Sequence, residues 1–539
     1  MIKFRIPNSP DIQTRFFGQF TAKDIARIGI PVLIGYLTTP IGLAGSVVAG
    51  LVIGFVLYRV TVHGKHLDEF TADTVTWAWK VHRNATVDFR QNPEKHGVRT
   101  EDGDVLTGHL LVYPVNLSLQ NQDEQAALHR RLQDVLETVS YPVKLHIIQD
   151  TRSLTQGTII ENNDFDADQL YNAAASYVDT YAESADGHNI AVPVISVPVK
   201  KHTGGVWGSL FPWRSGTRTE TEQQRILFRR LQEIENALDT AKLETARINW
   251  SNFDTAINNK YQDTTPEPFY TDTRGPWMKT VVIEEYPDTV ELGWTAEIAR
   301  CDGEVDITQI VEPADPGTTV KALNRAVEQL SAEISSWINA GYLGTTDLES
   351  RLEDAEWMLE RFTAGEDLPV KYKAYITARG DTKAACDRVM DQVTTQLDMR
   401  QFEYRVPVAE TFTVQQTIAP HAGVEEADTD VMPSSSAAAG FPFGTRPFPK
   451  SGVVVGEDSR DEAPVLLDRF SWKAPHTVKL GATGSGKSYG TKLELLRSAY
   501  FYEDARFIVV DPKKEYRGLV KQIGGHVYEI GSDADRDDI

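Results

Sequence analysis

The sequence predicts an α/β protein that begins with a helical hairpin and ends in a glycine-rich strand–loop–helix unit. Three observations lead to this prediction. Residues 28–58 carry no charged side chain, residues 105–399 alternate between strand-like and helix-like patterns, and a glycine-rich loop at residues 481–488 separates an apolar run from a helical pattern. The 539 residues leave room for roughly two to four domains.

The charge-free run at residues 28–58 is predicted to form a transmembrane hairpin. A single helix of this length would measure about 46 Å, well beyond the roughly 30 Å of a hydrocarbon core. Pro40 favours a break into two short helices. Basic residues flank both ends, so residues 1–64 are expected to anchor the chain in the cell membrane with its bulk on the cytoplasmic side. A buried helical pair without a membrane is the alternative.

Residues 65–422 are predicted to form an α/β (α+β) domain. Strand-like and helix-like segments follow one another, and the region 219–260 has the periodicity and charge pairing of one or two helices. The other segments, in chain order, are strand 106–120, helix 123–139, strand 141–150, strand 279–294, helix 317–363, strand 370–380 and helix 381–399.

Two loops interrupt this pattern. The loop 200–218 places Trp207 and Trp213 between basic ends, which fits either a membrane-surface or docking loop or a connector that covers a local core. Residues 423–451 are acidic and then rich in Ser, Ala, Pro and Gly. That composition predicts a linker, which would lead into a nucleotide-binding domain at residues 452–539.

The overall charge is strongly acidic. Asp and Glu number 77 against 55 Lys and Arg, which gives a formal net charge of −22. Such a surface stays hydrated at high salt, as in halophilic archaea, although an ordinary acidic protein has the same balance. It argues against a surface that coats nucleic acid, so any DNA contact is expected to be local. The two cysteines, Cys301 and Cys386, exclude a disulfide framework and a cysteine-rich metal site.

The loop at residues 481–488 fits the phosphate-binding pattern G-x-x-x-x-G-K-[ST]. Its glycines permit backbone N–H groups to turn toward a phosphate, and the following helix adds its dipole. Lys487 is expected to reach the β- and γ-phosphates of ATP as the catalytic cation, and Ser488 to ligate Mg²⁺. The residues expected to bind the nucleotide are Gly481, Ala482, Thr483, Gly484, Ser485, Gly486, Lys487, Ser488 and Tyr489. A glycine-rich turn that happens to precede a lysine is the alternative.

Several segments occur in a recognisable order: "LLVYPVNLSLQNQDEQAALHRRLQDVLETVSYPVKLHII", "VVIEEYPDTVELGW", "GFPF", "GVVVGEDSRDEAPVLLDRF", the phosphate loop and "FIVVDPKKEYRGLVKQIGG". This order resembles the type IV secretion and conjugal-transfer ATPases of the CagE/TrbE/VirB type, in the HerA–FtsK branch of P-loop motors. The first 65 residues resemble the small hairpin membrane subunit of such systems.

The resemblance implies a RecA-like P-loop domain, a ring that is hexameric in the family, and channel subunits as partners for residues 65–425. The motor would energise transfer of substrates or assembly of a pilus. A HerA-like DNA translocase and a nucleotide-binding scaffold without turnover remain alternatives.

The segment "FIVVDPKKEY" resembles the family strand that follows the phosphate-loop helix. Asp511 and Glu515 in it are candidates for contacting Mg²⁺ or a neighbouring subunit, with capping and salt bridging at a strand end as the alternative. The resemblance places the Walker B acidic pair and the arginine finger beyond Ile539. We therefore expect the P-loop domain to be truncated in this chain.

Overall fold

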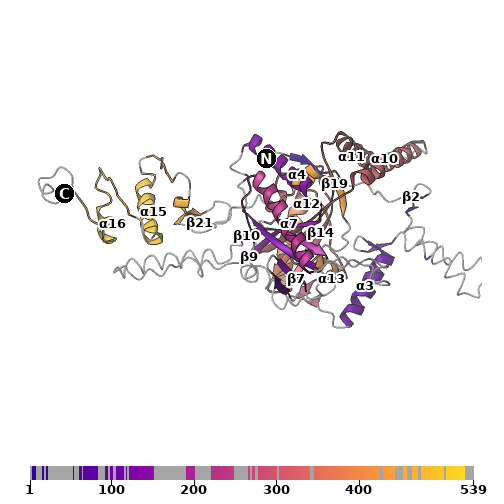
Figure 1. Ribbon diagram of the computed structural model, residues 1–539, viewed down its shortest axis with the longest axis horizontal. Coiled ribbons are helices and arrows are strands. Elements are labelled where there is room, and N and C mark those ends of the chain that lie inside the picture. Colours follow the sequence, from indigo (N-terminus) through magenta and orange to yellow (C-terminus); the bar gives the residue numbers. More distant parts are fainter. Residues whose placement is uncertain are drawn as a thin grey trace, which may run out of the picture. The chain divides into compact units, whose positions relative to one another are not determined.

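Figure 1 shows the computed structural model of the chain. It describes residues 3–7, 15–16, 20–21, 53, 60–62, 65–82, 91–94, 97–100, 105–113, 117, 121–150, 190–200, 220–247, 265–266, 270–272, 277–299, 301, 303–339, 345–423, 429–442, 453–457, 464–471, 475–482, 484–502 and 506–528. The chain divides into two compact units. One comprises Met1–Asp150 with Ala191–Pro447, and the other comprises Thr151–Ile190 with Phe448–Ile539.

A 13-stranded sheet forms the centre of the first unit. Its main path runs β12-β13-β14-β17-β16-β9-β10-β8-β7-β6, with β11 beside β8, β18 beside β14 and β19 beside β17. The longest register is antiparallel and joins β16 to β17, from Glu304 opposite Arg379 to Pro313 opposite Val370. The strands are β6 (Gln91–Glu94), β7 (Gly97–Thr100), β8 (Val105–Val112), β9 (Val143–Asp150), β10 (Ile190–Lys200), β11 (Thr245–Arg247), β12 (Thr265–Pro266), β13 (Thr271–Asp272), β14 (Trp277–Glu285), β16 (Glu304–Pro313), β17 (Pro369–Gly380), β18 (Glu403–Arg405) and β19 (Asp430–Pro433).

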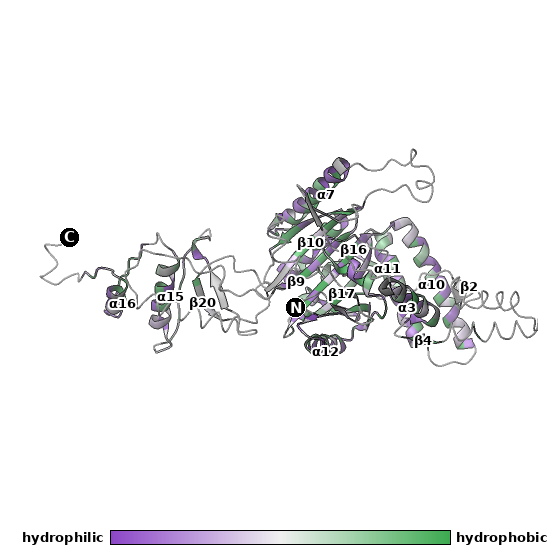
Figure 2. Ribbon diagram, turned by 90° about the horizontal axis from the view of Figure 1, so that it is seen from below, coloured by the Kyte–Doolittle hydropathy of each residue, from purple (hydrophilic) through white to green (hydrophobic). Residues whose placement is uncertain are grey.

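A large apolar cluster joins these strands to the surrounding helices. Leu110, Ile307 and Ile376 of the sheet are fully buried in it. Figure 2 shows the hydrophobic colour concentrated on central strands such as β9, β10, β16 and β17. The helices that contribute to the cluster are α4 (Gln122–Thr138), α7 (Glu220–Thr240), α9 (Trp294–Ile298), α12 (Lys383–Met399) and α14 (Ser434–Ala439). Apolar side chains of strands and helices therefore share one core, which confirms the predicted mixture of helix and strand.

A second, smaller cluster lies under α13 (Thr411–Ile418). Val282, Ile310 and Tyr375 of the sheet pack there with Phe412. Strand residues that alternate along the chain with those of the large cluster point to the opposite face of the sheet. Several of these residues are polar and buried, including Asp306 and Arg379. Burial of a polar or charged side chain is unfavourable unless the side chain has a hydrogen-bond or ion-pair partner. Substitution of either partner in these contacts is therefore expected to be destabilising.

A helical hairpin packs beside the sheet. Figure 1 shows α10 (Pro316–Asn339) and α11 (Thr346–Ala364) side by side. They share a core of their own, made by Leu323, Leu330, Ala355 and Met358. The left-handed Gly365 (φ 70°) ends α11, as is usual for a glycine at a helix C-terminus.

The N-terminal residues belong to the first unit. Strand β1 (Lys3–Arg5) pairs with β15 (Thr289–Glu291), and Phe4 stacks on His129 with ring centroids 3.7 Å apart. The Arg5 guanidinium reaches Asp354 of α11 at 2.9 Å. Residues 3–5 are therefore a strand of the first unit, whereas the sequence predicted that residues 1–64 form a separate anchor.

The predicted transmembrane hairpin and the membrane localisation are corrected by the structure. In the ranges that it describes, no helix is both long enough and apolar enough to cross a membrane. Residues 28–58 lie outside the described residues except for Ile53. The prediction rested on the absence of charge, and uncharged composition alone does not identify the surroundings of a segment. The remaining elements near this end are β2 (Arg15–Phe16), β3 (Phe20–Thr21), β4 (Thr61–Val62), β5 (Lys65–His66) and α3 (Leu67–His82).

Part of the segment expected to be a linker lies in the core instead. Residues 430–433 form β19, which pairs with β17, and residues 434–439 form the buried helix α14. The side chains of Ala437 to Ala439 are small, which lets the helix approach its neighbours closely. Asp367 accepts hydrogen bonds from the Ser434 hydroxyl at 3.0 Å and the Ser435 N–H at 2.8 Å. The small residues that predicted a linker serve close packing in α14 instead.

The second unit contains a hairpin and two helices in its described part. Strands β20 (Val453–Glu457) and β21 (Pro464–Leu467) pair antiparallel and lead to a short 3₁₀ helix, η4 (Arg469–Ser471). The helices are α15 (Lys487–Phe501) and α16 (Arg517–Gln522). Residues 477–480 and 507–510, which the sequence predicts as strands, have no strand assignment. Their apolar side chains Val478, Leu480, Ile508 and Val510 are largely exposed.

Candidate functional site

The glycine-rich loop turns sharply into α15. Gly484 and Gly486 adopt left-handed backbone angles, with φ of 84° and 83°. This conformation is sterically unfavourable for a residue with a Cβ, so glycine suits both positions. The Ser485 N–H donates to the carbonyl of Ala482 at 3.2 Å and closes the turn. Gly486 is the N-cap residue of α15, so the loop delivers the chain directly into the helix. Thr483 lies outside the described residues.

Lys487 is the first residue of α15, and its side chain folds back over the loop. Its Nζ donates to the carbonyl of Ala482 at 2.9 Å and to the carbonyl of Gly481. The ammonium group therefore lies beside the loop, at the end of the helix where the first backbone N–H groups have no partner within the helix. Positive charge and free N–H groups together favour an anion such as a phosphate.

Ser488 and Tyr489 follow in the first turn of α15, and both are exposed. Their hydroxyl groups are accessible at the same helix end as Lys487, so the structure brings the predicted binding residues together along one short stretch. A serine hydroxyl in this place fits one ligand position of Mg²⁺, which takes oxygen ligands and shares them with phosphate oxygens. ATP would supply the phosphoryl group that reacts, the ion would offset its negative charge, and the chain would hold both.

Asp511 has a clear local role. Its two carboxylate oxygens accept the backbone N–H groups of Lys513 at 3.1 Å and Tyr516 at 2.7 Å. These bonds shape the turn that leads into α16, which agrees with the capping alternative. Glu515 is exposed in the same turn. A role for either residue in binding Mg²⁺ or a neighbouring subunit stays a prediction.

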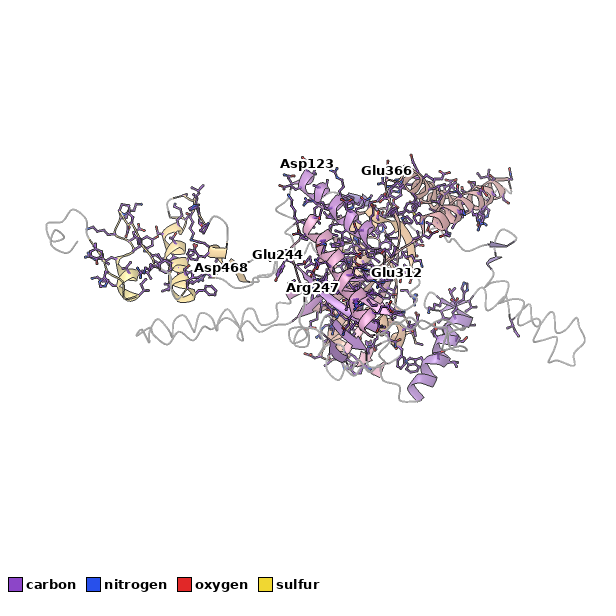
Figure 3. The ribbon with its side chains drawn as sticks, viewed as in Figure 1. Asp123, Glu244, Arg247, Glu312, Glu366 and Asp468 are labelled. Carbon is purple, nitrogen blue, oxygen red and sulfur yellow. The ribbon has the colours of Figure 1, made fainter. Side chains whose placement is uncertain are left out.

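Polar contacts around α15 were missed by sequence reasoning. The Glu494 carboxylate of α15 forms ion pairs with Arg469 of η4 and with Lys479, which stands two residues before the loop. At the end of the helix, the Tyr502 hydroxyl donates to Asp468 at 2.7 Å; Asp468 is labelled in Figure 3. Burial, together with the Asp468 carboxylate, raises the pKa of Tyr502 to about 12. The sequence offered one indication of this arrangement. Lys487 and Glu494 are seven residues apart, and this spacing places two residues on the same face of a helix.

The first unit holds a different cluster of titratable groups, made by His109, Lys144, His146 and His421. The Lys144 ammonium donates to the carbonyl of Ala419 at 3.0 Å, at the C-terminus of α13. Burial, and then the positive charge of Lys144, lowers the pKa of His421 to about 3. Burial also lowers the pKa of His109 and His146 well below the usual range, with Lys144 and the other histidines adding to the effect. Within the described ranges, no three His, Cys, Asp or Glu side chains are arranged to hold a metal ion.

Comparison with known proteins gives a partial similarity. No protein-family model matches the chain. The DNA translocase FtsK of Vibrio parahaemolyticus is 39% identical over 83 residues, which cover 15% of this chain and 8% of that protein. The FtsK proteins of Vibrio vulnificus and Shewanella oneidensis are 44% and 43% identical over 63 residues, which cover 11% of this chain and 6% and 7% of theirs.

The matched part is therefore a small fraction of each relative. The chain is similar in part to FtsK DNA translocases, which belong to the FtsK/HerA superfamily of P-loop proteins. The narrower resemblance to secretion ATPases of the CagE/TrbE/VirB type finds no support among these relatives.

Proposed function

We propose that residues 481–489 bind ATP with Mg²⁺ and that the protein is an ATP-driven motor of the FtsK/HerA kind. One observation carries the proposal. Two left-handed glycines turn the chain into α15 while the first side chain of that helix, Lys487, lies back over the loop. This arrangement supports a site for a polyphosphate, because it combines N–H donors, a helix dipole and the point charge of the lysine ammonium.

Each residue has a defined part in this proposal. Gly484 and Gly486 hold the loop in the shape that turns its N–H groups toward the β-phosphate. Lys487 exchanges its carbonyl acceptors on Gly481 and Ala482 for phosphate oxygens, which carry more negative charge. Ser488 provides a hydroxyl oxygen for Mg²⁺, and Tyr489 lies beside it on the exposed side of the helix.

Binding can be tested by titrating the full chain with ATP in the presence and absence of Mg²⁺. Replacing Lys487 by Ala removes charge-assisted hydrogen bonds of roughly 1.5–3 kcal/mol, so we expect the Kd to rise by about 10- to 100-fold. Lys492→Ala is the matched control, since Lys492 stands on the same helix with its ammonium 5.3 Å from the Tyr516 ring. Equal affinities of the wild type and Lys487→Ala would overturn the proposal.

The similarity to FtsK favours DNA as the substrate of the motor. In this proposal the subunits form a ring, hexameric as the resemblance implies, around the translocated DNA duplex. In a protein that also carries the Walker B acidic pair and the arginine finger of the family, double-stranded DNA is then expected to increase the rate of ATP hydrolysis severalfold. Hydrolysis that is indifferent to DNA would favour the type IV secretion alternative, in which the ATPase acts with channel subunits on a protein or pilus substrate. Binding without hydrolysis in a protein that carries those residues would favour the nucleotide-binding scaffold.

A further inference from the structure

Three elements of the second unit converge on one carboxylate. Glu494 of α15 pairs through one oxygen with the Arg469 guanidinium and through the other with the Lys479 ammonium. The Glu494 side chain is mostly buried, and the two cations are about one-third exposed. Both oxygens of a single acidic group therefore link η4, the segment before the phosphate loop, and the helix after it.

The position of Glu494 on α15 relates it to the loop. Glu494 follows Lys487 by seven residues, which places both on the same face of the helix, two turns apart. Thr491 lies between them, and its hydroxyl donates to the Lys487 carbonyl at 2.8 Å. Lys487, Thr491 and Glu494 thus form one polar stripe along α15.

Two contacts join the polar stripe to the N-terminal side of the loop. The Lys487 ammonium holds the carbonyl of Gly481, and Glu494 holds Lys479, two residues earlier. Residues 475–480 have no strand assignment, and the neighbouring side chains Val478 and Leu480 are largely exposed. Apolar packing therefore contributes little to the placement of this segment, and the ion pair carries more of it.

We propose that Glu494 is a positioning residue for the phosphate loop, an inference that rests on the function proposed above. Its carboxylate holds the segment entering the loop against the helix that leaves it, so that the loop N–H groups and Lys487 face one phosphate together. It also separates two cations. Burial and then the Arg469 charge lower the pKa of Lys479, and removing Glu494 leaves those two cations to repel each other.

The test is a double-substitution cycle on the full chain, with Mg²⁺ and ATP as the titrant. Glu494→Gln keeps the size of the side chain and removes its charge, and we expect the Kd to rise about fivefold. Lys479→Gln breaks only one of the two ion pairs of Glu494, so its effect is expected to be smaller. Because the double variant breaks no further contact of Glu494, it should bind about as well as Glu494→Gln alone. Glu494→Asp, which keeps the charge, should recover part of the affinity.

Two controls separate positioning from a general loss of structure. Glu328→Gln removes one exposed charge from helix α10 of the first unit and should leave the Kd unchanged. The thermal unfolding midpoint of each variant shows whether the fold is kept. Wild-type affinity in Glu494→Gln, or effects of the two substitutions that add fully, would overturn the positioning role while leaving the proposed function intact. A wild-type chain that fails to bind ATP overturns both.

Discussion

The strands of the first unit and the extended segments beside the phosphate loop have similar apolar sequences and very different surroundings. Ile307 and Ile376 of the sheet have 0% of their surface exposed. Val478 and Ile508, on either side of α15, are 80% and 93% exposed. Among the residues of the second unit whose side chains the structure describes, Val453 alone is buried. The first unit has an apolar core of its own, whereas the loop region is held by hydrogen bonds and ion pairs.

The difference shows what maintains each region. Burial of many apolar side chains stabilises the sheet, and these side chains come from segments far apart in the sequence. The phosphate loop is shaped by contacts within a few residues: the left-handed glycines, the bond from Ser485 to Ala482, and the bonds of Lys487. Substitutions in the sheet should therefore change global stability, whereas substitutions in the loop should change ATP binding.

The largest effect is expected at the buried ion pair of the sheet. Asp306 bonds to Arg379 and also accepts the Gln149 N–H at 2.9 Å, and both charged side chains are almost fully buried. Asp306→Ala leaves a buried guanidinium without this partner, so we expect a loss of about 3–5 kcal/mol in the free energy of unfolding. Glu312→Ala on the same strand is the control, since its pair with Lys371 spans 3.9 Å near the surface. Chemical denaturation measures both, and equal effects would contradict the assignment of the buried pair.

The histidines near α13 should make the first unit sensitive to acid. The folded-state pKa of His421, about 3, lies below its ordinary value because of burial and Lys144. The histidine is therefore neutral in both states above about pH 6.5, and below that pH the unfolded chain binds the proton more readily. Stability should fall between pH 6.5 and about 3 with a slope of about 1.4 kcal/mol per pH unit for this histidine.

His109 and His146 shift in the same direction and add to this slope. Denaturation of the wild type and of His421→Asn at several pH values measures the contribution of His421. Between pH 6.5 and about 3, the free energy of unfolding of the variant should change less steeply with pH. The difference in slope should correspond to one proton, or about 1.4 kcal/mol per pH unit. An unchanged slope would show that this histidine is protonated in the folded protein.

A smaller effect is expected from an added methyl group at the loop. Gly486→Ala forces a residue with a Cβ to φ near 83°, which costs roughly 1–2 kcal/mol. Because the cost falls on the loop, ATP affinity should drop while the unfolding of the first unit stays the same. Gly490→Ala is the matched control, because a Cβ there meets no atom within 4 Å and alanine favours a helix. Similar affinities in the two variants would argue against the left-handed turn as the basis of binding.

The smallest effect is expected at the exposed segments. Ile508→Ser should change the free energy of unfolding by less than about 0.5 kcal/mol, as is usual for exposed positions. Ile376→Ala in the sheet should cost about 2–5 kcal/mol. A loss above about 1.5 kcal/mol at residue 508 would show that its side chain packs against a surface, and the contrast between the two regions would then be wrong.

Local patterns in the sequence predicted the elements well where the structure depends on near neighbours. The helical periodicity at residues 381–399 corresponds to α12 (Lys383–Met399), and the strand pattern at residues 370–380 corresponds to β17 (Pro369–Gly380). The turn at Gly484 and Gly486 and the helix that follows it were predicted in the same way, because the glycine spacing and the start of α15 are local features.

Features that depend on distant partners were not predictable in this way. The small residues of α14 resemble a linker as long as their neighbours α4, β17 and Asp367 are unknown. Strand β1 has only three residues and gains its place from β15, about 285 residues later in the chain. The pairing of Glu494 with Arg469 likewise needs the η4 turn to lie beside α15. Sequence spacing indicates a helix face but does not name the partner of each residue on it.

The most direct test of the proposed site is hydrogen–deuterium exchange of the full chain with and without Mg²⁺ and ATP. Bound phosphate takes up the N–H groups of the loop, so the account predicts slower exchange at residues 484–491 when the nucleotide is present. The sheet of the first unit should exchange equally in both conditions, because its hydrogen bonds lie within its own core. Protection confined to the first unit, with residues 484–491 unchanged, would contradict the assignment of the nucleotide site.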